Sequence, residues 1–256
     1  MYKIDLNCDL GESFGTYKLG MDDQVIPYIS SANIACGFHA SDPLVMSDTV
    51  KLAARFHTAV GAHPGYPDLV GFGRRNMNAS PKEVKAMIQY QIGALESFCR
   101  ANGISMHHVK PHGAMYNMAG KDEALAQAVA EAVYEVNPDL ILLALSGSKM
   151  IDAARKLGLR AASEVFADRA YEDDGSLVTR SKEGSMITDE NLAIERVIRM
   201  VKEQKVTSIH GKDIPIQADS VCVHGDGPKA LTFVKKLREA FDKEHILIET
   251  FQPGLR

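Results

Sequence analysis

The stretch that decides the fold is residues 140–169, LILLALSGSKMIDAARKLGLRAASEVFADR. It begins with an unbroken apolar run at residues 140–145, which has the length and composition of a buried parallel strand. A helical pattern follows at residues 148–157 and stops at Gly158, and a second strand candidate covers residues 161–165. Strands joined by a crossover helix run parallel in one sheet. The stretch therefore predicts one strand–helix–strand unit of a parallel α/β fold.

The same unit repeats along almost the whole chain. Strand candidates lie at residues 3–8, 31–36, 59–62, 106–110, 140–145, 161–165, 220–223 and 246–249. Helical patterns cover residues 41–56, 80–101, 121–136, 148–157, 188–205 and 228–243, and residues 208–218 indicate a short hairpin. No linker divides the chain, so we expect one domain over residues 1–256. Polar residues follow nearly every strand, which favours a closed, distorted TIM-like (β/α) barrel of seven or eight parallel strands over a doubly wound open sheet.

Composition and charge exclude several classes of protein. Of the 256 residues 45% are hydrophobic and 24% are charged, which is typical of a globular fold. Lys+Arg 29 against Asp+Glu 33 gives a net charge of −4, so the chain has no strong positive field for nucleic acid or an anionic membrane. The longest apolar run is far shorter than the ~20 residues that span a bilayer. Four scattered cysteines and an acidic start without an apolar leader favour free thiols and a cytoplasmic location.

Histidines, carboxylates or lysines stand beside glycine or proline where the strand candidates end. The segments are residues 5–12, 35–39, 61–68, 109–113, 145–148, 164–169 and 223–227. Because all strands of a parallel barrel end on one face, these side chains converge in space. The sequence therefore predicts an active site at the carboxyl ends of the strands. The long Gly/Pro-rich loop at residues 65–78 is a candidate lid over it.

The first three strands supply one group of candidates. Asn7 and Asp9 alternate along the first strand and point the same way, into the barrel or its mouth. His39 and His63 follow the next two strands at matching positions, although either is compatible with a loop histidine bonded to a carbonyl. Asp9 with these two histidines is also a common divalent-metal set, so the three are candidate metal ligands.

The middle strands supply the second group. Lys110 ends a buried strand next to His112, and burial would depress the pKa of the lysine toward use as a base or anion anchor. Glu164 stands near a strand end. Asp168 and Arg169 follow in the loop, where they fit either a substrate-binding pair or a surface salt bridge.

The last strand candidate of the ring supplies the third group. His224 and Asp226 follow it among glycines, and we expect both to bind substrate. No P-loop, dinucleotide-binding glycine motif, GxSxG or HExxH stands in the sequence. The expected chemistry is therefore polar acid–base or metal work at a barrel mouth.

Five motifs carry a resemblance to a known family. DLNCDLGE (residues 5–12), NIACGFH (33–39), GAHP (61–64), VKPHGA (109–114) and the segment 164–171 closely resemble the LamB/YcsF lactam-utilisation family, also called the A subunits of 5-oxoprolinase. The similarity covers essentially the whole chain, in order. It implies a barrel related to sugar deacetylases and some glycoside hydrolases. It also implies ATP-dependent opening of 5-oxo-L-proline (pyroglutamate) to L-glutamate, together with two other subunits, B and C.

Such a reaction needs a base for water, donors for a developing oxyanion and cations for phosphate. Asp9 or Glu164 is the candidate base, and Lys110 or Arg169 the candidate anion holder. Proton donors or relays are the three histidines His39, His63 and His112. ATP with Mg²⁺ is the expected cofactor, bound by this chain or together with its partner subunits. Two alternatives stay open, a metal-dependent deacetylase or amide hydrolase acting alone, and a non-catalytic subunit that binds substrate. Each is compatible with a homo-oligomer.

Overall fold

Eight parallel strands lie where the sequence predicts them. The structure, a computed structural model, describes residues 1–223 and 228–252. The parallel strands are β1 (Tyr2–Leu10), β2 (Ser31–Ala35), β3 (Ala59–His63), β4 (Met106–Val109), β5 (Ile141–Leu145), β6 (Arg160–Phe166), β9 (Ser220–Cys222) and β10 (Ile246–Ile248). Their carboxyl ends share one face of the molecule, so the loops that follow them are neighbours in space.

Seven of these strands close the barrel. They follow one another in the order β1-β2-β3-β4-β5-β6-β9, and β9 pairs back onto residues 5–7 of β1. The eighth strand, β10, pairs only with residues 2–4 of β1, ahead of the segment that β9 and β2 occupy. The predicted TIM-like α/β barrel is therefore confirmed, with seven strands in the ring.

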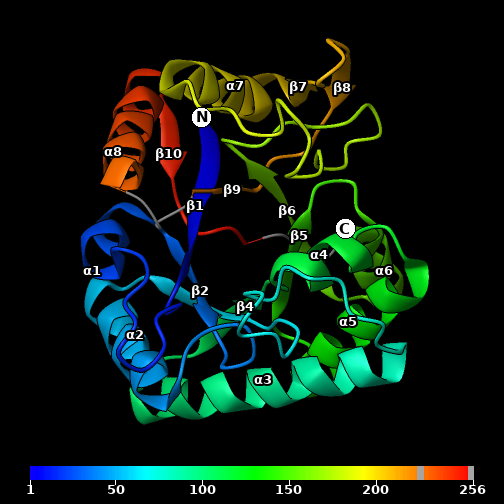
Figure 1. The fold of residues 1–256 in the computed structure, drawn as a ribbon. Helices are drawn as coiled ribbons and strands as arrows, with labels where there is room; N and C mark the ends of the chain where they lie inside the picture. The colour runs from blue at the N-terminus through cyan, green and yellow to red at the C-terminus, as the bar shows by residue number, and fades with distance from the viewer. Residues whose placement is uncertain (224–227, 253–256) are drawn as a thin grey trace.

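Helices surround this barrel (Figure 1). The long ones are α2 (Pro43–Phe56), α3 (Pro81–Ala101), α5 (Glu123–Val136), α6 (Lys149–Leu157), α7 (Glu190–Glu203) and α8 (Pro228–Lys243). Short helices α1 (Asp22–Val25), η1 (Ile26–Tyr28) and α4 (Gly113–Ala119) lie in loops, and β7 (Lys205–Thr207) with β8 (Asp213–Pro215) forms the hairpin. The predicted capping box is present: Ser80 accepts from the Glu83 N–H while Glu83 accepts from the Ser80 N–H. None of the described helices is long and apolar enough to cross a membrane.

The interior of the barrel is polar, whereas branched aliphatic side chains fill most barrels of this kind. Asp5, Asn7 and Asp9 alternate along β1 and face inward. Asp5 accepts hydrogen bonds from Ser31 on β2 and from Ser220 on β9, and Asn7 donates to Ser220 at 2.7 Å. Burial raises the pKa of Asp5 to about 6 in spite of these donors. Polar groups in the interior are thus held by one another across neighbouring strands.

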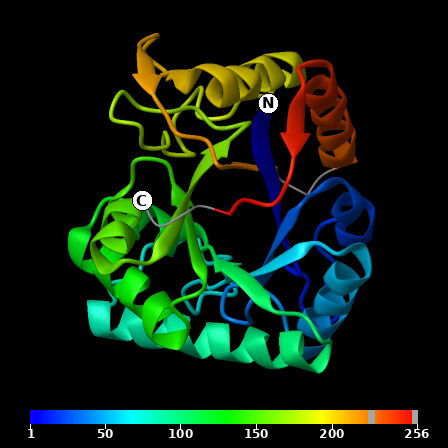
Figure 2. The ribbon, with the colours of Figure 1, turned by 180° about the vertical axis from the view of Figure 1, so that it is seen from behind.

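The segment after β10 crosses the amino-terminal end of the barrel, as Figure 2 shows from behind. Its Phe251 is buried against Ile141 and Leu143 of β5. The same ring lies 5.0 Å and 5.3 Å, centroid to centroid, from His107 and His108 of β4. This apolar plug forms the floor of the barrel, and the carboxyl ends of the strands form its mouth.

Candidate active site

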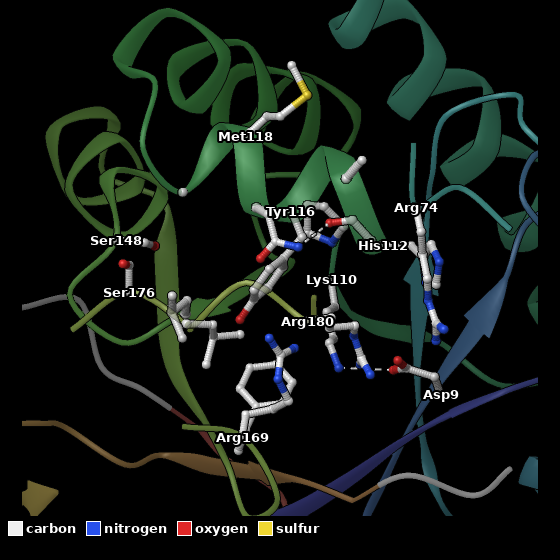
Figure 3. A pocket seen from close by; sticks show the side chains of 18 of the residues that line it. Asp9, Arg74, Lys110, His112, Tyr116, Met118, Ser148, Arg169, Ser176 and Arg180 are labelled. Carbon is white, nitrogen blue, oxygen red and sulfur yellow. Dashed lines mark hydrogen bonds and ion pairs between the residues drawn. The ribbon is translucent and has the colours of Figure 1, made fainter. Parts of the chain in front are cut away.

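A cavity of about 760 Å³ opens at the barrel mouth (Figure 3). Loops that follow β1, β3, β4, β5 and β6 all contribute to its wall. In Figure 3 the side chains of Lys110, Tyr116 and Arg169 point into the same space beside Asp9. The strand ends therefore meet as the sequence predicts.

Lys110 lies at the centre of the polar cluster at this mouth. Its Nζ lies 2.7 Å from Glu164 Oε1, 3.0 Å from Asp9 Oδ1 and 3.2 Å from Asn7 Oδ1, with Cys222 Sγ at 3.4 Å. Burial alone would lower the pKa of Lys110, but Asp9, Cys222 and Glu164 together raise it well above 10.5. The expectation of a depressed lysine pKa is wrong, because two carboxylates converge on the ammonium. Lys110 is a fixed cation rather than a base.

Glu164 has no exposed surface and meets the cavity only through its partners. Its Oε2 accepts a hydrogen bond from the hydroxyl of Tyr116, at 2.6 Å, and its other oxygen faces Lys110. Tyr116 stands on α4, one helical turn after His112, and lines the cavity. Tyr116 thus stands between the buried carboxylate and the cavity.

Asp9, His63 and His112 form a second branch of the site. His63 Nε2 lies 3.2 Å from Asp9 Oδ2 and 2.9 Å from His112 Nδ1. Burial would raise the pKa of Asp9, but His63 and Lys110 hold it well below 3.8. Burial, with His63 nearby, lowers the pKa of His112 to about 3. Asp9 is therefore an anion and His112 a neutral imidazole near pH 7.

His39 packs behind this branch instead of facing the cavity. Its ring stacks on that of His112, with centroids 3.7 Å apart, and burial lowers its pKa well below 6.5. Glycine makes the approach possible: a Cβ on Gly65 would lie 2.6 Å from His39 Nδ1, and one on Gly73 would lie 2.7 Å from His39 Cβ. The carbonyl of Phe72 accepts from His112 Nε2 at 2.8 Å. The loop after β3, expected as a lid, is thus built into the wall.

Three arginines line the cavity: Arg74, Arg169 and Arg180. Arg169 is 5% exposed and donates to the Val178 carbonyl at 2.6 Å, while its Nε has no hydrogen-bond partner among the described residues. Burial lowers the pKa of Arg169 to about 10, so it is still a cation near pH 7. Guanidinium groups bind carboxylates and phosphates well, because their N–H groups match the spacing of two oxygens.

The structure separates nine of the predicted site residues into three sets. Those on the cavity wall are Asp9, His63, Lys110, His112 and Arg169. Those one layer behind it, in contact with wall residues, are His39 and Glu164. His224 and Asp226 lie outside the described residues.

Two predicted substrate-binding residues do not line the cavity. Asn7 is fully buried one layer below Asp9, where Ser220, Asn33 and Lys110 use its amide. Asp168 is adjacent to Arg169 in the bend after β6, but Arg169 lines the cavity and Asp168 does not. The substrate-binding roles of Asn7 and Asp168 stay predictions, and any such role would act through neighbouring residues of the wall.

Tyr116 and Arg180 also line the cavity, although the sequence patterns do not predict them. Tyr116 follows His112 by four residues, and this spacing places both on one helix face, but the seven-residue α4 carries too few apolar repeats to be recognised. Arg180 lies in the irregular segment between β6 and α7, and no local pattern marks it. Glu12 also lies on the wall, with its Oε1 3.7 Å from His112 Nδ1.

The described residues that offer a metal-ligating atom close together are Glu12, His39, His63 and His112, whose atoms all lie within 4.8 Å of one another. This set shares His39 and His63 with the predicted ligands and adds Glu12 and His112. Asp9 joins it through His63.

Fold and site together define a TIM-like barrel protein with a buried acid–base cluster at its mouth. The LamB/YcsF family model matches residues 4–255, and the chain belongs to this family. Over 248 residues it is 73% identical to the A subunit of 5-oxoprolinase from Clostridium beijerinckii, an alignment that covers 97% of each chain.

Two solved structures of other proteins are similar in fold to this chain. The lactam utilization protein from Thermus thermophilus matches with a TM-score of 0.92 and 46% identity, covering 97% of this chain and 100% of that one. A putative cellobiose-phosphate cleavage protein from Enterococcus faecalis matches with a TM-score of 0.60 and 14% identity over 97% of each chain, which shows a shared fold alone.

Proposed function

We propose that this chain is the A subunit of a 5-oxoprolinase that opens 5-oxo-L-proline to L-glutamate, coupled to ATP hydrolysis, together with partner subunits B and C. The observation that carries the proposal is the 73% identity to a 5-oxoprolinase chain of the same type over 97% of both sequences. The cavity supports it, because arginines and a buried lysine surround a space lined by neutral imidazole and carboxylate groups.

The chemistry explains why ATP is needed. A five-membered lactam is a stable amide, so the carbonyl requires activation. Transfer of the γ-phosphoryl group of ATP to the carbonyl oxygen of the lactam releases ADP. Water then adds to the carbonyl carbon. Cleavage of the C–N bond, with a proton delivered to the nitrogen, leaves γ-glutamyl phosphate, which a second water hydrolyses to glutamate and phosphate. Catalysis of such steps rests on positioning and on stabilising negative charge.

The residues of the wall fit these tasks. Arg169, with Arg74 or Arg180, binds the substrate carboxylate or the transferred phosphate. The fixed charge of Lys110 stabilises the developing oxyanion. Glu164 takes the proton of the attacking water through the Tyr116 hydroxyl. In this proposal Asp9 is a fixed anion that orients Lys110 and His63, since a carboxylate with so low a pKa is a weak base.

The decisive measurement is 5-oxoproline-dependent release of ADP and glutamate by the purified chain, first alone and then with its partner subunits. We expect coupled turnover only in the complete complex, with ATP as its Mg²⁺ complex. Hydrolysis of 5-oxoproline or of an acetylated sugar by the chain alone, without ATP, would establish the single-chain hydrolase instead. Full turnover by a complex carrying Lys110→Ala and His112→Ala would establish the non-catalytic role of binding substrate.

A further inference from the structure

The backbone around His63 and His112 fixes which ring nitrogens carry hydrogen. His63 Nδ1 lies 2.7 Å from the Lys110 carbonyl oxygen, and His112 Nε2 lies 2.8 Å from the Phe72 carbonyl oxygen. A carbonyl oxygen can only accept, so both of these nitrogens are N–H donors. In the neutral rings, His63 Nε2 and His112 Nδ1 therefore each present a lone pair.

The two nitrogens with these lone pairs lie close together, and each lies beside a carboxylate. The ring nitrogens lie 2.9 Å apart. Asp9 Oδ2 is 3.2 Å from His63 Nε2, and Glu12 Oε1 is 3.7 Å from His112 Nδ1. With both rings neutral, all four atoms are acceptors, and acceptors this close in a buried setting repel one another unless a proton or a metal cation lies between them.

Two cations lie near this cluster, Lys110 and Arg74. Lys110 is directed to the other oxygen of Asp9 and to Glu164. Arg74 is on the cavity wall, with its guanidinium over the Phe72 ring. Three carboxylates, Asp9, Glu12 and Glu164, stand beside these two cations, so the charge of the cluster is compatible with one more positive ion.

We propose that Asp9, Glu12, His63 and His112 bind one divalent transition-metal ion, of the zinc or manganese class, at the barrel mouth. Two imidazoles with two carboxylates are a ligand set for such ions. Ligands about 2.1 Å from one ion stand ~3–4 Å apart, which matches the observed 2.9, 3.2 and 3.7 Å. Metal-binding histidines also hold their second N–H on a carbonyl or carboxylate, as both rings do here.

His39 supports this site from behind. Its Nε2 lies 3.5 Å from Glu12 Oε1, and both of its ring nitrogens lack hydrogen-bond partners among the described residues. Stacked on His112, it holds that ring in place and offers a further donor beside Glu12. Such an ion would supply Lewis acidity beside the reacting carbonyl. The proposal does not rest on the ATP-coupled function, because it concerns binding by the chain itself.

The test measures metal binding without substrate, ATP or turnover. The purified chain is stripped with a chelator and titrated with Co²⁺, whose visible absorption reports its ligands, and then with Zn²⁺ and Mn²⁺ by calorimetry. We expect one ion per chain, with an absorption band typical of mixed nitrogen and oxygen ligands, and a raised melting temperature.

Variants locate the ion. His112→Ala and Glu12→Gln should each weaken binding at least tenfold, and Glu12→Gln covers the case in which the histidine variant fails to fold. The matched control is His210→Ala, because His210 also stands next to two carboxylates, Asp173 at 3.2 Å and Glu172 at 4.0 Å, but is exposed. It should leave binding unchanged.

Two results would overturn the proposal. One is less than a tenth of an ion per chain at 100-fold excess Zn²⁺, which would mean that a proton shared by His63 and His112 provides the positive charge. The other is equal binding by the His112→Ala, Glu12→Gln and His210→Ala variants.

Discussion

Two pairs of close histidines lie in the barrel, one at the floor and one at the mouth, and their surroundings differ. At the floor, His107 Nδ1 and His108 Nδ1 are 3.2 Å apart, His108 Nε2 lies 2.7 Å from the Asn33 amide oxygen, and Phe251 covers both rings. At the mouth, His63 and His112 are 2.9 Å apart and face carboxylates.

The contrast shows what turns a histidine pair into a reactive site. The floor pair contacts the Asn33 amide, the ring and backbone of Phe251 and each other, so packing and neutral hydrogen bonds hold these two rings. The mouth pair opens on a cavity and has its tautomers fixed by backbone carbonyls, with charged groups on both sides. Changes at the two ends should therefore separate loss of activity from loss of stability.

The largest effect is expected from Lys110→Met at the mouth. It leaves Asp9 and Glu164 facing each other without their shared cation, and breaking a buried ion pair from one side costs about 3–5 kcal/mol. We expect unfolding in urea to show a loss of this size and 5-oxoproline-dependent ADP release to fall at least ~1000-fold. The double variant Lys110→Met/Glu164→Gln is the control: it should recover part of the stability and none of the activity. Retained turnover in a folded Lys110→Met complex would contradict the role given to the lysine.

A loss of stability without a loss of activity is expected from Phe251→Ala at the floor. Removing a buried aromatic side chain costs ~3–5 kcal/mol, so the free energy of unfolding should drop by about 3 kcal/mol. Because Phe251 is at the far end of the barrel, kcat and KM for 5-oxoproline should change by less than about twofold. A large rise in KM would show that the two ends of the barrel are coupled.

A smaller change at the mouth is Tyr116→Phe, which removes only the hydroxyl that donates to Glu164. A hydrogen bond to a charged group contributes about 1.5–3 kcal/mol. We expect kcat to fall roughly 100-fold, the lower end of the effect of a lost proton-transfer group, while the melting temperature drops by only a few degrees. Tyr134→Phe, which changes a partly exposed tyrosine on α5, is the matched control. Equal kcat values for the two variants would exclude the hydroxyl from proton transfer.

The sequence predicts the elements of this molecule better than it predicts the electrostatics of its site. Apolar runs and capping residues such as Ser80 give the strands and long helices nearly to the residue, because those signals are local. The pKa of Lys110 is predicted in the wrong direction, since nothing local shows that carboxylates from β1 and β6 meet at one ammonium. The inactive floor pair and the mouth pair are likewise distinguished by neighbours from other strands.

The smallest effect in this comparison concerns the pH dependence of stability and is expected from His108→Gln. Burial lowers the pKa of His108 well below 6.5, so the folded chain keeps it neutral while the unfolded chain binds a proton as the pH falls through 6.5. The unfolded state then binds more protons than the folded state, so the free energy of unfolding decreases as the pH falls. Asp5, with a pKa raised to about 6, acts in the opposite direction between pH 6 and 3.8, but it is present in both proteins and cancels in their difference.

Urea unfolding at pH 7 and pH 5 measures that difference. The unmodified chain should lose about 2 kcal/mol more than His108→Gln over this interval, the contribution of one histidine kept neutral by the fold. Turnover at neutral pH should stay within about threefold, because glutamine still donates to Asn33. If both proteins lost stability equally between pH 7 and pH 5, His108 would accept a proton in the folded chain. The floor histidines would then not be kept neutral by the fold.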